Sequence, residues 1–373
     1  MPTQADIFKE RQRTFKQKNP NVRIEEDMLT RKLERERLLH RLLHGGKCRE
    51  LICVSVQAFK KLCTILQRDG GLRPTQRMSV EEHVARFLHI VRSVRTTTSC
   101  RYHSRLLCND IRNTLVSWTY RRSKSTTSRC FHRVLWAVIA LESCYIQQPQ
   151  CDVVPKENQE NRRFYPYFKN FVGAINGTHV RVKVHSKDAP RYRGRKGYPA
   201  INVLAACSFD LKFTYVLTGW EGRYCLVDVG LPHTTQLKTP SRGVRYHLKE
   251  YSALPPENAS ELFNLRHASL RNAIERTFGV LKRRLPIFRI TQEPFYSCET
   301  QFDTFLACCM LHNRDTRLEQ EALHEVLHEQ SGDVQRNVTD QHGVIPEQLR
   351  NTISTQIWDN YLLKPNNELN MSN

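Results

Sequence analysis

Three apolar runs between residues 171 and 220 predict the strands of a β-sheet. They read FVGAINGTHVRVKV (171–184), INVLAACSF (201–209) and LKFTYVLTGW (211–220). Each is rich in Val, Ile, Phe, Tyr and Thr, and Gly, Pro and charged residues separate them, which is typical of strands. The apolar residues are more continuous than alternating. This pattern predicts that part of the sheet is covered on both faces.

The region before these strands has the hydrophobic period of helices. Ser55 is placed to cap a first helix, which Asp69 and the two glycines after it end. Ser79 and Glu82 form a capping box that opens a second helix, and a third is expected from about Ser125. The apolar positions of the three helices are Val56, Phe59, Leu62, Cys63 and Leu66; Val80, Val84, Phe87, Leu88 and Val91; and Phe131, Val134, Leu135, Val138, Ile139 and Leu141.

These patterns predict an α+β or α/β chain with an N-terminal helical domain before a sheet domain. Short polar stretches and shifts in composition give the boundaries. The expected segments are a charged flexible arm ending in a basic helix (1–47), a helical domain (48–150), a linker (151–163), a mixed-sheet domain (164–313) and a polar, partly disordered tail (314–373).

Charge points to a polyanionic partner. The chain has 58 Lys plus Arg against 37 Asp plus Glu, a formal charge of +21, and nucleic acid is the commonest partner of so basic a chain. We expect no membrane partner, because no run of about 18 apolar residues occurs. No apolar signal segment opens the chain. The 13 cysteines are scattered without a CxxC pair, which favours buried thiols over zinc ligands.

The start of the third predicted helix, RRSKSTTSRCFHR (121–133), is a candidate DNA contact. A recognition helix presents its N-terminal residues to base edges and its basic flank to phosphates. An ordinary capped helix on a basic surface would give the same pattern. The candidate DNA-binding residues here are Arg121, Arg122, Lys124, Ser125, Thr126, Arg129 and Arg133.

A second candidate is the basic loop RYRGRKGYP (191–199) between the first two predicted strands. Arg191, Arg193, Arg195 and Lys196 alternate there with tyrosines that could stack on bases. A solvated loop is the alternative.

Long ordered blocks from about residue 48 to residue 313 resemble the PIF/Harbinger transposase family. More narrowly, they are similar to its domesticated plant relatives of the antagonist-of-like-heterochromatin-protein type. The blocks are GAINGTH, RGRKGYPAINVLAACSFDLKFTYVLTGWEG, LVDVGLP, RGVRYHLKEY and LFNLRHASLRNAIERTFGVLKRRLPIFR. The resemblance implies a helix-turn-helix-like domain, then a ribonuclease-H-like core in which three acidic residues hold two divalent metals, Mg²⁺ or Mn²⁺, on DNA. It also implies a nuclear protein, with a Myb-like partner or a Polycomb-type chromatin complex.

The acidic positions implied by the resemblance are only partly filled. Asn176 stands where the family has its first acid, and Glu275 matches the third. The second acid and its helix, expected after GWEG (219–222), are missing. Asp228 is a possible metal-proximal substitute, although a strand-end Asp making local hydrogen bonds is the alternative. Since Mg²⁺ needs charged oxygen ligands, we expect weak or absent metal binding.

The missing helix is also a problem of topology. The resemblance implies strand order 3-2-1-4-5, in which strand 4 runs parallel to strand 1. A parallel crossover needs about a dozen residues or more, normally with a helix. The connection from Glu221 to Arg223 is too short. Either the fourth strand pairs elsewhere, such as against the third, or the sequence lacks a segment at Gly222–Arg223. The second alternative, a gap in the gene model or decay of a transposon relative, is favoured.

The sequence therefore leaves two functions to be tested. The first is a catalytically inactive, DNA- or chromatin-binding nuclear protein derived from a Harbinger-type transposase. The alternative is a metal-dependent DNA endonuclease, that is, a hydrolase of the same family.

Overall fold

A computed structural model of the chain shows two compact units, Met1–Ala137 and Val138–Asn373. The boundary falls inside the third predicted helix, before the linker expected at 151–163. The structure describes residues 20–92, 111–149, 154–182, 184–193, 198–220, 239–251, 254–288, 296–327 and 346–363. Each unit is described by itself.

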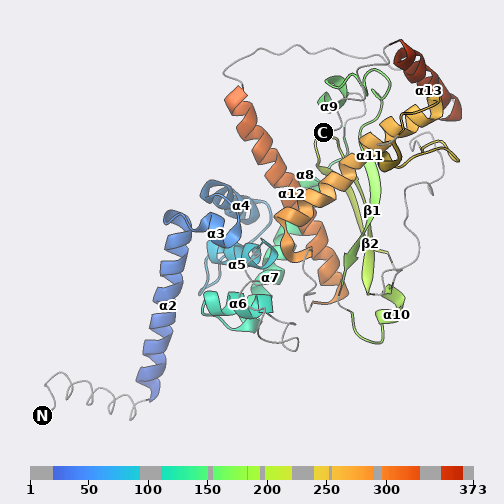
Figure 1. The fold of residues 1–373 in the computed structure, drawn as a ribbon. Helices are drawn as coiled ribbons and strands as arrows, with labels where there is room; N and C mark the ends of the chain where they lie inside the picture. Colours follow the sequence, from blue (N-terminus) through green and yellow to red (C-terminus); the bar gives the residue numbers. More distant parts are fainter. Residues whose placement is uncertain are drawn as a thin grey trace, which may run out of the picture. The chain divides into compact units, whose positions relative to one another are not determined.

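The first unit is helical, as predicted (Figure 1). Ser55 caps the first predicted helix, because its hydroxyl accepts a hydrogen bond from the Ala58 N–H at 3.2 Å. The Ser79 hydroxyl likewise accepts the Glu82 N–H at 3.2 Å. Its helices are α2 (Pro20–His44), α3 (Cys48–Ile52), α4 (Val56–Arg68), α5 (Val80–Arg92), α6 (Ile111–Thr119) and α7 (Lys124–Ile139).

Helix α5 lies at the centre of the first unit. Its predicted apolar face is buried, and the ring of Phe87 packs 5.1 Å from that of Phe131 on α7. The polar residues of α5 are also buried, including Arg86, which has no exposed surface. The hydrophobic period predicted a half-exposed helix, whereas α5 is enclosed on all sides.

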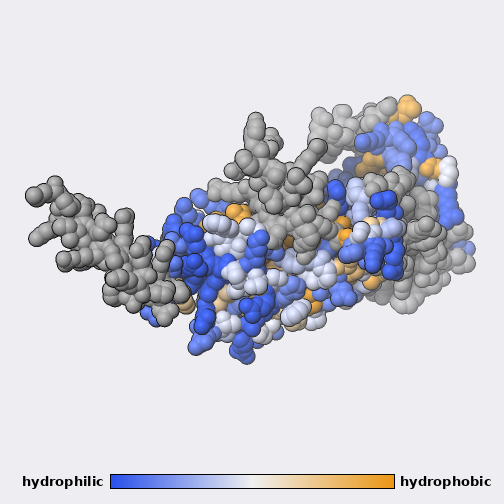
Figure 2. Space-filling view, turned by 90° about the horizontal axis from the view of Figure 1, so that it is seen from below, coloured by the Kyte–Doolittle hydropathy of each residue, from blue (hydrophilic) through white to orange (hydrophobic). Residues whose placement is uncertain are grey.

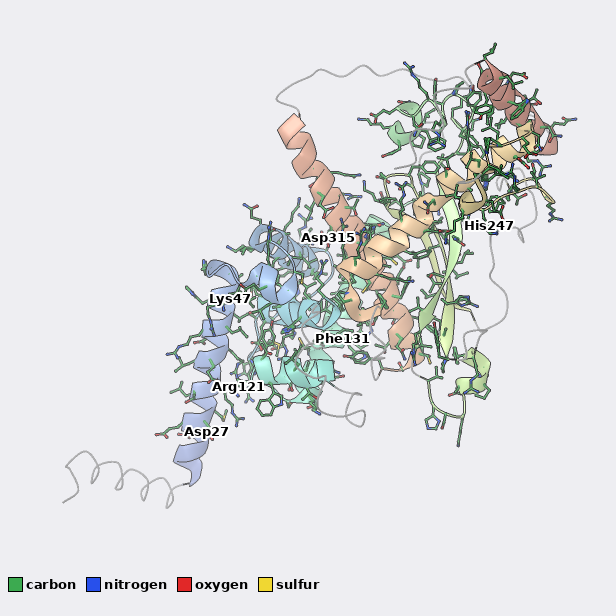
Figure 3. The ribbon with its side chains drawn as sticks, viewed as in Figure 1. Asp27, Lys47, Arg121, Phe131, His247 and Asp315 are labelled. Carbon is green, nitrogen blue, oxygen red and sulfur yellow. The ribbon has the colours of Figure 1, made fainter. Side chains whose placement is uncertain are left out.

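Helix α2 is the basic helix expected at the end of the N-terminal arm. Only its C-terminal half packs on the unit, where Leu42 is fully buried. In the outer half, residues 25–33 are exposed, including Asp27 (Figure 3). The described surface over α2 is mainly hydrophilic (Figure 2).

Helices α6 and α7 are joined by the short segment 120–123. Arg121 in this connection has φ +49°, a left-handed conformation that turns the chain sharply. The Ser123 hydroxyl accepts the Thr126 N–H at 3.2 Å and so caps α7. Two helices joined by a turn of three or four residues have the connectivity of a helix-turn-helix.

The second unit contains the three predicted strands, β1 (Ala174–Arg181), β2 (Ala200–Cys207) and β3 (Phe213–Trp220). They form an antiparallel sheet in the order β1-β2-β3, and Asn176 of β1 lies opposite Ala205 of β2. No further strand joins this sheet within the described ranges. Residues 221–238, where the fourth strand and Asp228 were expected, lie outside them.

Helices pack along this sheet, with α11 beside β1 and α12 beside β3 (Figure 1). The polar tail predicted from residue 314 is partly helical in the structure. Helix α12 continues into the start of this tail, and α13 within the tail packs on α11, with Ile357 fully buried. The helices of this unit are α8 (Glu142–Tyr145), α9 (Lys156–Gln159), α10 (Ala189–Tyr192), η1 (Leu248–Tyr251), α11 (Ala259–Arg284), η2 (Pro286–Phe288), α12 (Cys298–Leu327) and α13 (Pro346–Leu362).

The cysteines within the described ranges are all free thiols. Cys63, Cys207 and Cys309 are buried, as their apolar surroundings predicted, whereas Cys53 is exposed. Burial raises the pKa of Cys207 to about 11, so this thiol stays protonated and unreactive at neutral pH.

Candidate functional site

The structure brings Asn176 and Glu275 together although 99 residues separate them. Asn176 lies in the middle of β1, on the face that carries Ala174 and Val180. Glu275 lies on α11, whose residues Ala273, Ile274 and Phe278 are buried. Packing of α11 along β1 therefore places the two residues at one point on the sheet.

The amide of Asn176 faces Glu275 with its NH₂ group. Its Oδ1 accepts the Gly177 N–H at 2.8 Å, which leaves Nδ2 to donate to Glu275 Oε1 at 3.4 Å. The same Oε1 forms an ion pair with Arg271 Nη2 at 3.1 Å. Two N–H donors thus converge on one carboxylate oxygen. The Glu275 side chain remains 51% exposed.

Arg271 was not recognised from the sequence. Its guanidinium lies 5.6 Å from the centre of the Tyr246 ring, a cation–π distance, and it pairs with Glu275 one helical turn further on. The spacing i, i+4 was the available signal, because oppositely charged residues at this spacing meet on a helix face.

The residues at this point do not fit a divalent metal centre. A Mg²⁺ site needs charged oxygen ligands, whereas Glu275 is met here by an amide NH₂ and a guanidinium. A cation at Oε1 would have to displace both donors. Within the described part of the chain, no group of three or more His, Cys, Asp or Glu side chains converges elsewhere either.

Asp210, another acidic residue near the strands, is already engaged. It lies in the β2–β3 turn, where its carboxylate accepts from Ser208 and pairs with Lys212 at 2.9 Å. Burial would raise the pKa of Asp210, but these hydrogen bonds outweigh burial and lower it. Asp210 also lines a pocket of about 620 Å³ with Phe213 and Asn313, to which neither Asn176 nor Glu275 belongs.

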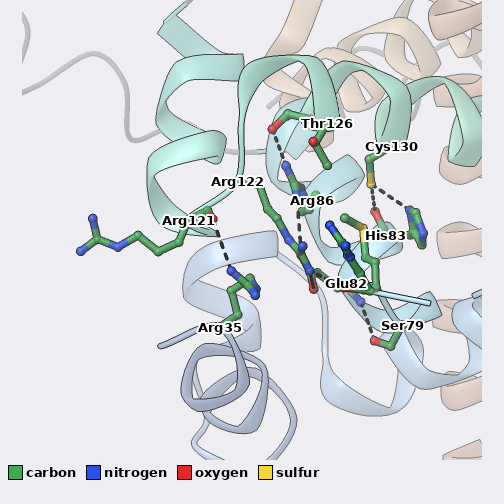
Figure 4. Close-up of polar contacts among 12 residues, drawn as sticks. Arg35, Ser79, Glu82, His83, Arg86, Arg121, Arg122, Thr126 and Cys130 are labelled. Carbon is green, nitrogen blue, oxygen red and sulfur yellow. Dashed lines mark hydrogen bonds and ion pairs between the residues drawn. The ribbon is translucent and has the colours of Figure 1, made fainter. Parts of the chain in front are cut away.

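The predicted DNA-contact segment before α7 contains a structural arginine. Arg122 donates to both carboxylate oxygens of Glu82, at 3.1 and 3.2 Å, and also to the Arg77 carbonyl (Figure 4). Glu82 pairs in addition with Arg86 at 3.4 Å, and Arg86 donates to the Thr127 hydroxyl. This network joins α5 to the start of α7.

Arg121 contacts helix α2 at the surface of the same unit. Its guanidinium pairs with Glu34 of α2 at 2.7 Å. Figure 4 shows the second contact, in which the Arg121 carbonyl accepts from Arg35. The hydroxyls of Ser125 and Thr126 lie 3.1 and 2.8 Å from that of Ser123, within the cap of α7.

The exposed face of α7 carries the remaining predicted residues. Lys124, Ser125, Arg129 and Arg133 are exposed, and Arg129 and Arg133 form no ion pair with any residue that the structure describes. One turn later, Trp136 is 61% exposed. Arginines beside an exposed indole ring give this face both charge and a stacking surface.

The basic loop between β1 and β2 is only partly described. Arg191 and Arg193 are exposed, whereas Arg195 and Lys196 lie outside the described residues. At the base of the loop, the Arg181 guanidinium lies 4.7 Å from the centre of the Tyr198 ring. This tyrosine therefore packs on the chain itself.

Comparison with known proteins gives the class of this chain. Residues 223–313 match the DDE superfamily endonuclease family, and residues 30–105 match a domain of unknown function (DUF8040). The chain is thus a distant relative of the Harbinger-derived DDE nucleases. Its curated relatives include the proteins named "Putative nuclease HARBI1" from cattle and human, each 25% identical over 208 residues, and from mouse, 26% identical over the same length.

These similarities cover part of each protein. The alignments span 51% of this chain and 59% of each relative, so the chain matches about three fifths of the length of these curated relatives. No solved structure matches it. Among the described helices, none combines the length and apolarity that a bilayer span requires.

Proposed function

We propose that this chain is a nuclear, DNA-binding relative of the Harbinger nucleases that does not cleave DNA. The observation that carries the proposal is the contact of Asn176 and Arg271 with one oxygen of Glu275. A two-metal nuclease needs that carboxylate to bind a cation. Here Arg271 neutralises the carboxylate and the Asn176 amide donates to the same oxygen, so this oxygen is occupied by donors from the chain.

Binding to DNA is supported by the α6–turn–α7 arrangement and by the exposed face of α7. Arg129 and Arg133 lie one helical turn apart on that face, and the endonuclease relationship makes nucleic acid the natural ligand. In this proposal Arg122 holds the start of α7 in place, while Arg129 and Arg133 contact phosphates. A Myb-like or Polycomb-type partner, and membership of the plant subgroup, remain predictions of the resemblance.

The first test separates binding from cleavage. Purified chain is incubated with supercoiled plasmid in Mg²⁺ or Mn²⁺, and duplex binding is measured in parallel in EDTA. We expect intact plasmid and metal-independent binding. Nicking that is lost in Glu275→Ala would instead establish the metal-dependent endonuclease. A chain that neither nicks nor binds DNA at low salt would contradict both functions.

The second test locates the contact on α7. Replacing Arg129 and Arg133 by Ala removes two cations that form no ion pair with a described residue, so the slope of log affinity against log salt is expected to fall by about 2. Lys60→Ala, which removes one exposed charge from α4, is the matched control and is expected to leave the slope unchanged. An unaltered slope in the Arg129/Arg133 double variant would exclude α7 as the DNA contact.

A further inference from the structure

The C-terminal half of α11 has one open face. Its N-terminal half is enclosed, with Leu262, Phe263 and Asn264 almost fully buried. Beyond this point the exposed residues recur at helical spacing: Glu275, Arg276, Gly279 and Arg283. Together with Lys282 beside it, this stripe is called the α11 face.

Gly279 at the middle of the α11 face is not required by the fold. A Cβ added there would meet no atom within 4 Å, and its φ is not in the left-handed region. Glycine inside a helix is less favourable than alanine, because it loses more backbone entropy on folding. Neither backbone geometry nor packing against the described residues explains Gly279. Its effect is a flat helix surface that a group from outside can approach closely.

The charges around this flat surface are basic. Arg276 and Arg283 lie seven residues apart on either side of Gly279, and neither forms an ion pair or hydrogen bond with a described residue. The ammonium group of Lys282 donates to Thr178 Oγ1 of β1 at 3.2 Å, which fixes it beside the sheet.

The remaining charges on and beside the α11 face offset each other or serve the fold. The negative charge of Glu275 is balanced by Arg271. The next basic residue, Arg284, is engaged with Thr316 at 2.9 Å and with Glu319, both on α12. Arg276 and Arg283 therefore leave positive charge around Gly279, with the Lys282 ammonium group held beside them at the sheet, and an anion is the complementary ligand.

We propose that the α11 face binds the phosphodiester backbone of DNA without a metal ion, with Gly279 as the point of closest approach. The proposal rests on the DNA-binding function above and adds a second contact in the other unit. Arg276, Lys282 and Arg283 supply the charge that metal ions would provide at an intact nuclease centre. The backbone then passes beside Glu275, which its partners keep neutralised.

The experiment measures duplex DNA affinity in EDTA over a salt series for full-length variants. Arg276→Ala with Arg283→Ala is expected to lower the salt slope by about 2, with Lys60→Ala as the charge control. Gly279→Gln is the steric test. It is expected to raise the thermal midpoint, because glutamine is the better helix former, and yet to weaken DNA binding about tenfold. A structural defect would lower both quantities together.

The outcomes separate this inference from the proposed function. One outcome is that Arg129→Ala/Arg133→Ala loses affinity while the Gly279 and Arg276/Arg283 variants bind DNA as the wild type does. This result would overturn only the proposal that the α11 face binds DNA. A wild-type chain that binds no DNA would overturn both. Binding that requires Mn²⁺ and disappears in EDTA would also overturn the metal-free contact. Weakened binding in both α11 variants, with folding intact by circular dichroism, is the expected result.

Discussion

Glu82 in the first unit and Glu275 in the second are each held by two donor side chains, but in opposite surroundings. Glu82 pairs with Arg86 and Arg122, and its side chain is 5% exposed. Glu275 pairs with Arg271 and Asn176 while 51% of its side chain is exposed. The same arrangement therefore holds helices together in one unit and leaves a partly solvated site in the other. Burial, not the number of contacts, decides which of them the fold depends on.

The largest effect is expected for Glu82→Ala. This change leaves Arg86, which has no exposed surface, as an uncompensated buried charge, and such losses cost about 3–5 kcal/mol. Chemical denaturation with hydrogen exchange of the α5 amides measures it. The exposed pair Lys32–Glu36 of α2 provides the matched control, because Glu36→Ala is expected to change stability by less than about 1 kcal/mol. Equal losses of stability in Glu82→Ala and Glu36→Ala would contradict the conclusion that burial decides the importance of an ion pair.

Acid is expected to weaken the first unit next. Burial holds His83 and His89 neutral and lowers the pKa of each to about 4 from 6.5. Below pH 6.5 these histidines bind protons in the unfolded chain but stay neutral in the folded unit. The free energy of unfolding therefore falls as the pH drops from 6.5 to 4, and the loss is complete below pH 4. Each histidine should lower the free energy of unfolding by about 2 kcal/mol at pH 5 relative to pH 7.

Denaturation of His89→Gln at both pH values measures this effect. The variant is expected to lose less stability on acidification than the wild-type chain does. A pH dependence identical in the two proteins would show that His89 does not stay neutral in the folded unit.

The sequence predicted the helices and strands better than it predicted the contacts between them. The caps at Ser55 and Ser79 and the three strands depend on local residues, and they are confirmed. The pairing of Asn176 with Glu275 followed only from the resemblance, because contacts between residues 99 positions apart leave no local pattern. The burial of Arg86 was missed for the same reason, since its partner Thr127 lies on another helix. Helix α13 was missed because its buried residues are few among polar ones.

A smaller effect is expected when Asn176 becomes Asp. The change removes the NH₂ donor and places a second carboxylate beside Glu275, so repulsion should cost about 1 kcal/mol at pH 8. Urea denaturation of the variant at pH 8, read by hydrogen exchange in β1, makes the measurement. A variant more stable than wild type at pH 8 would mean that Arg271 already overcompensates Glu275.

The smallest effect is expected for Glu275→Ala. The carboxylate is half exposed and its pairing with Arg271 is an i, i+4 contact, which typically contributes about 0.3–0.5 kcal/mol. The Arg271 side chain is 15% exposed and loses its counter-charge in this variant, but it keeps its contact with the Tyr246 ring, so the loss of stability should stay well below that of Glu82→Ala. Thermal unfolding should therefore change little, although removing a negative charge beside Arg276 should strengthen DNA binding severalfold at low salt. A loss as large as that of Glu82→Ala would make Glu275 a residue on which the fold depends, and the contrast between the two units would fail.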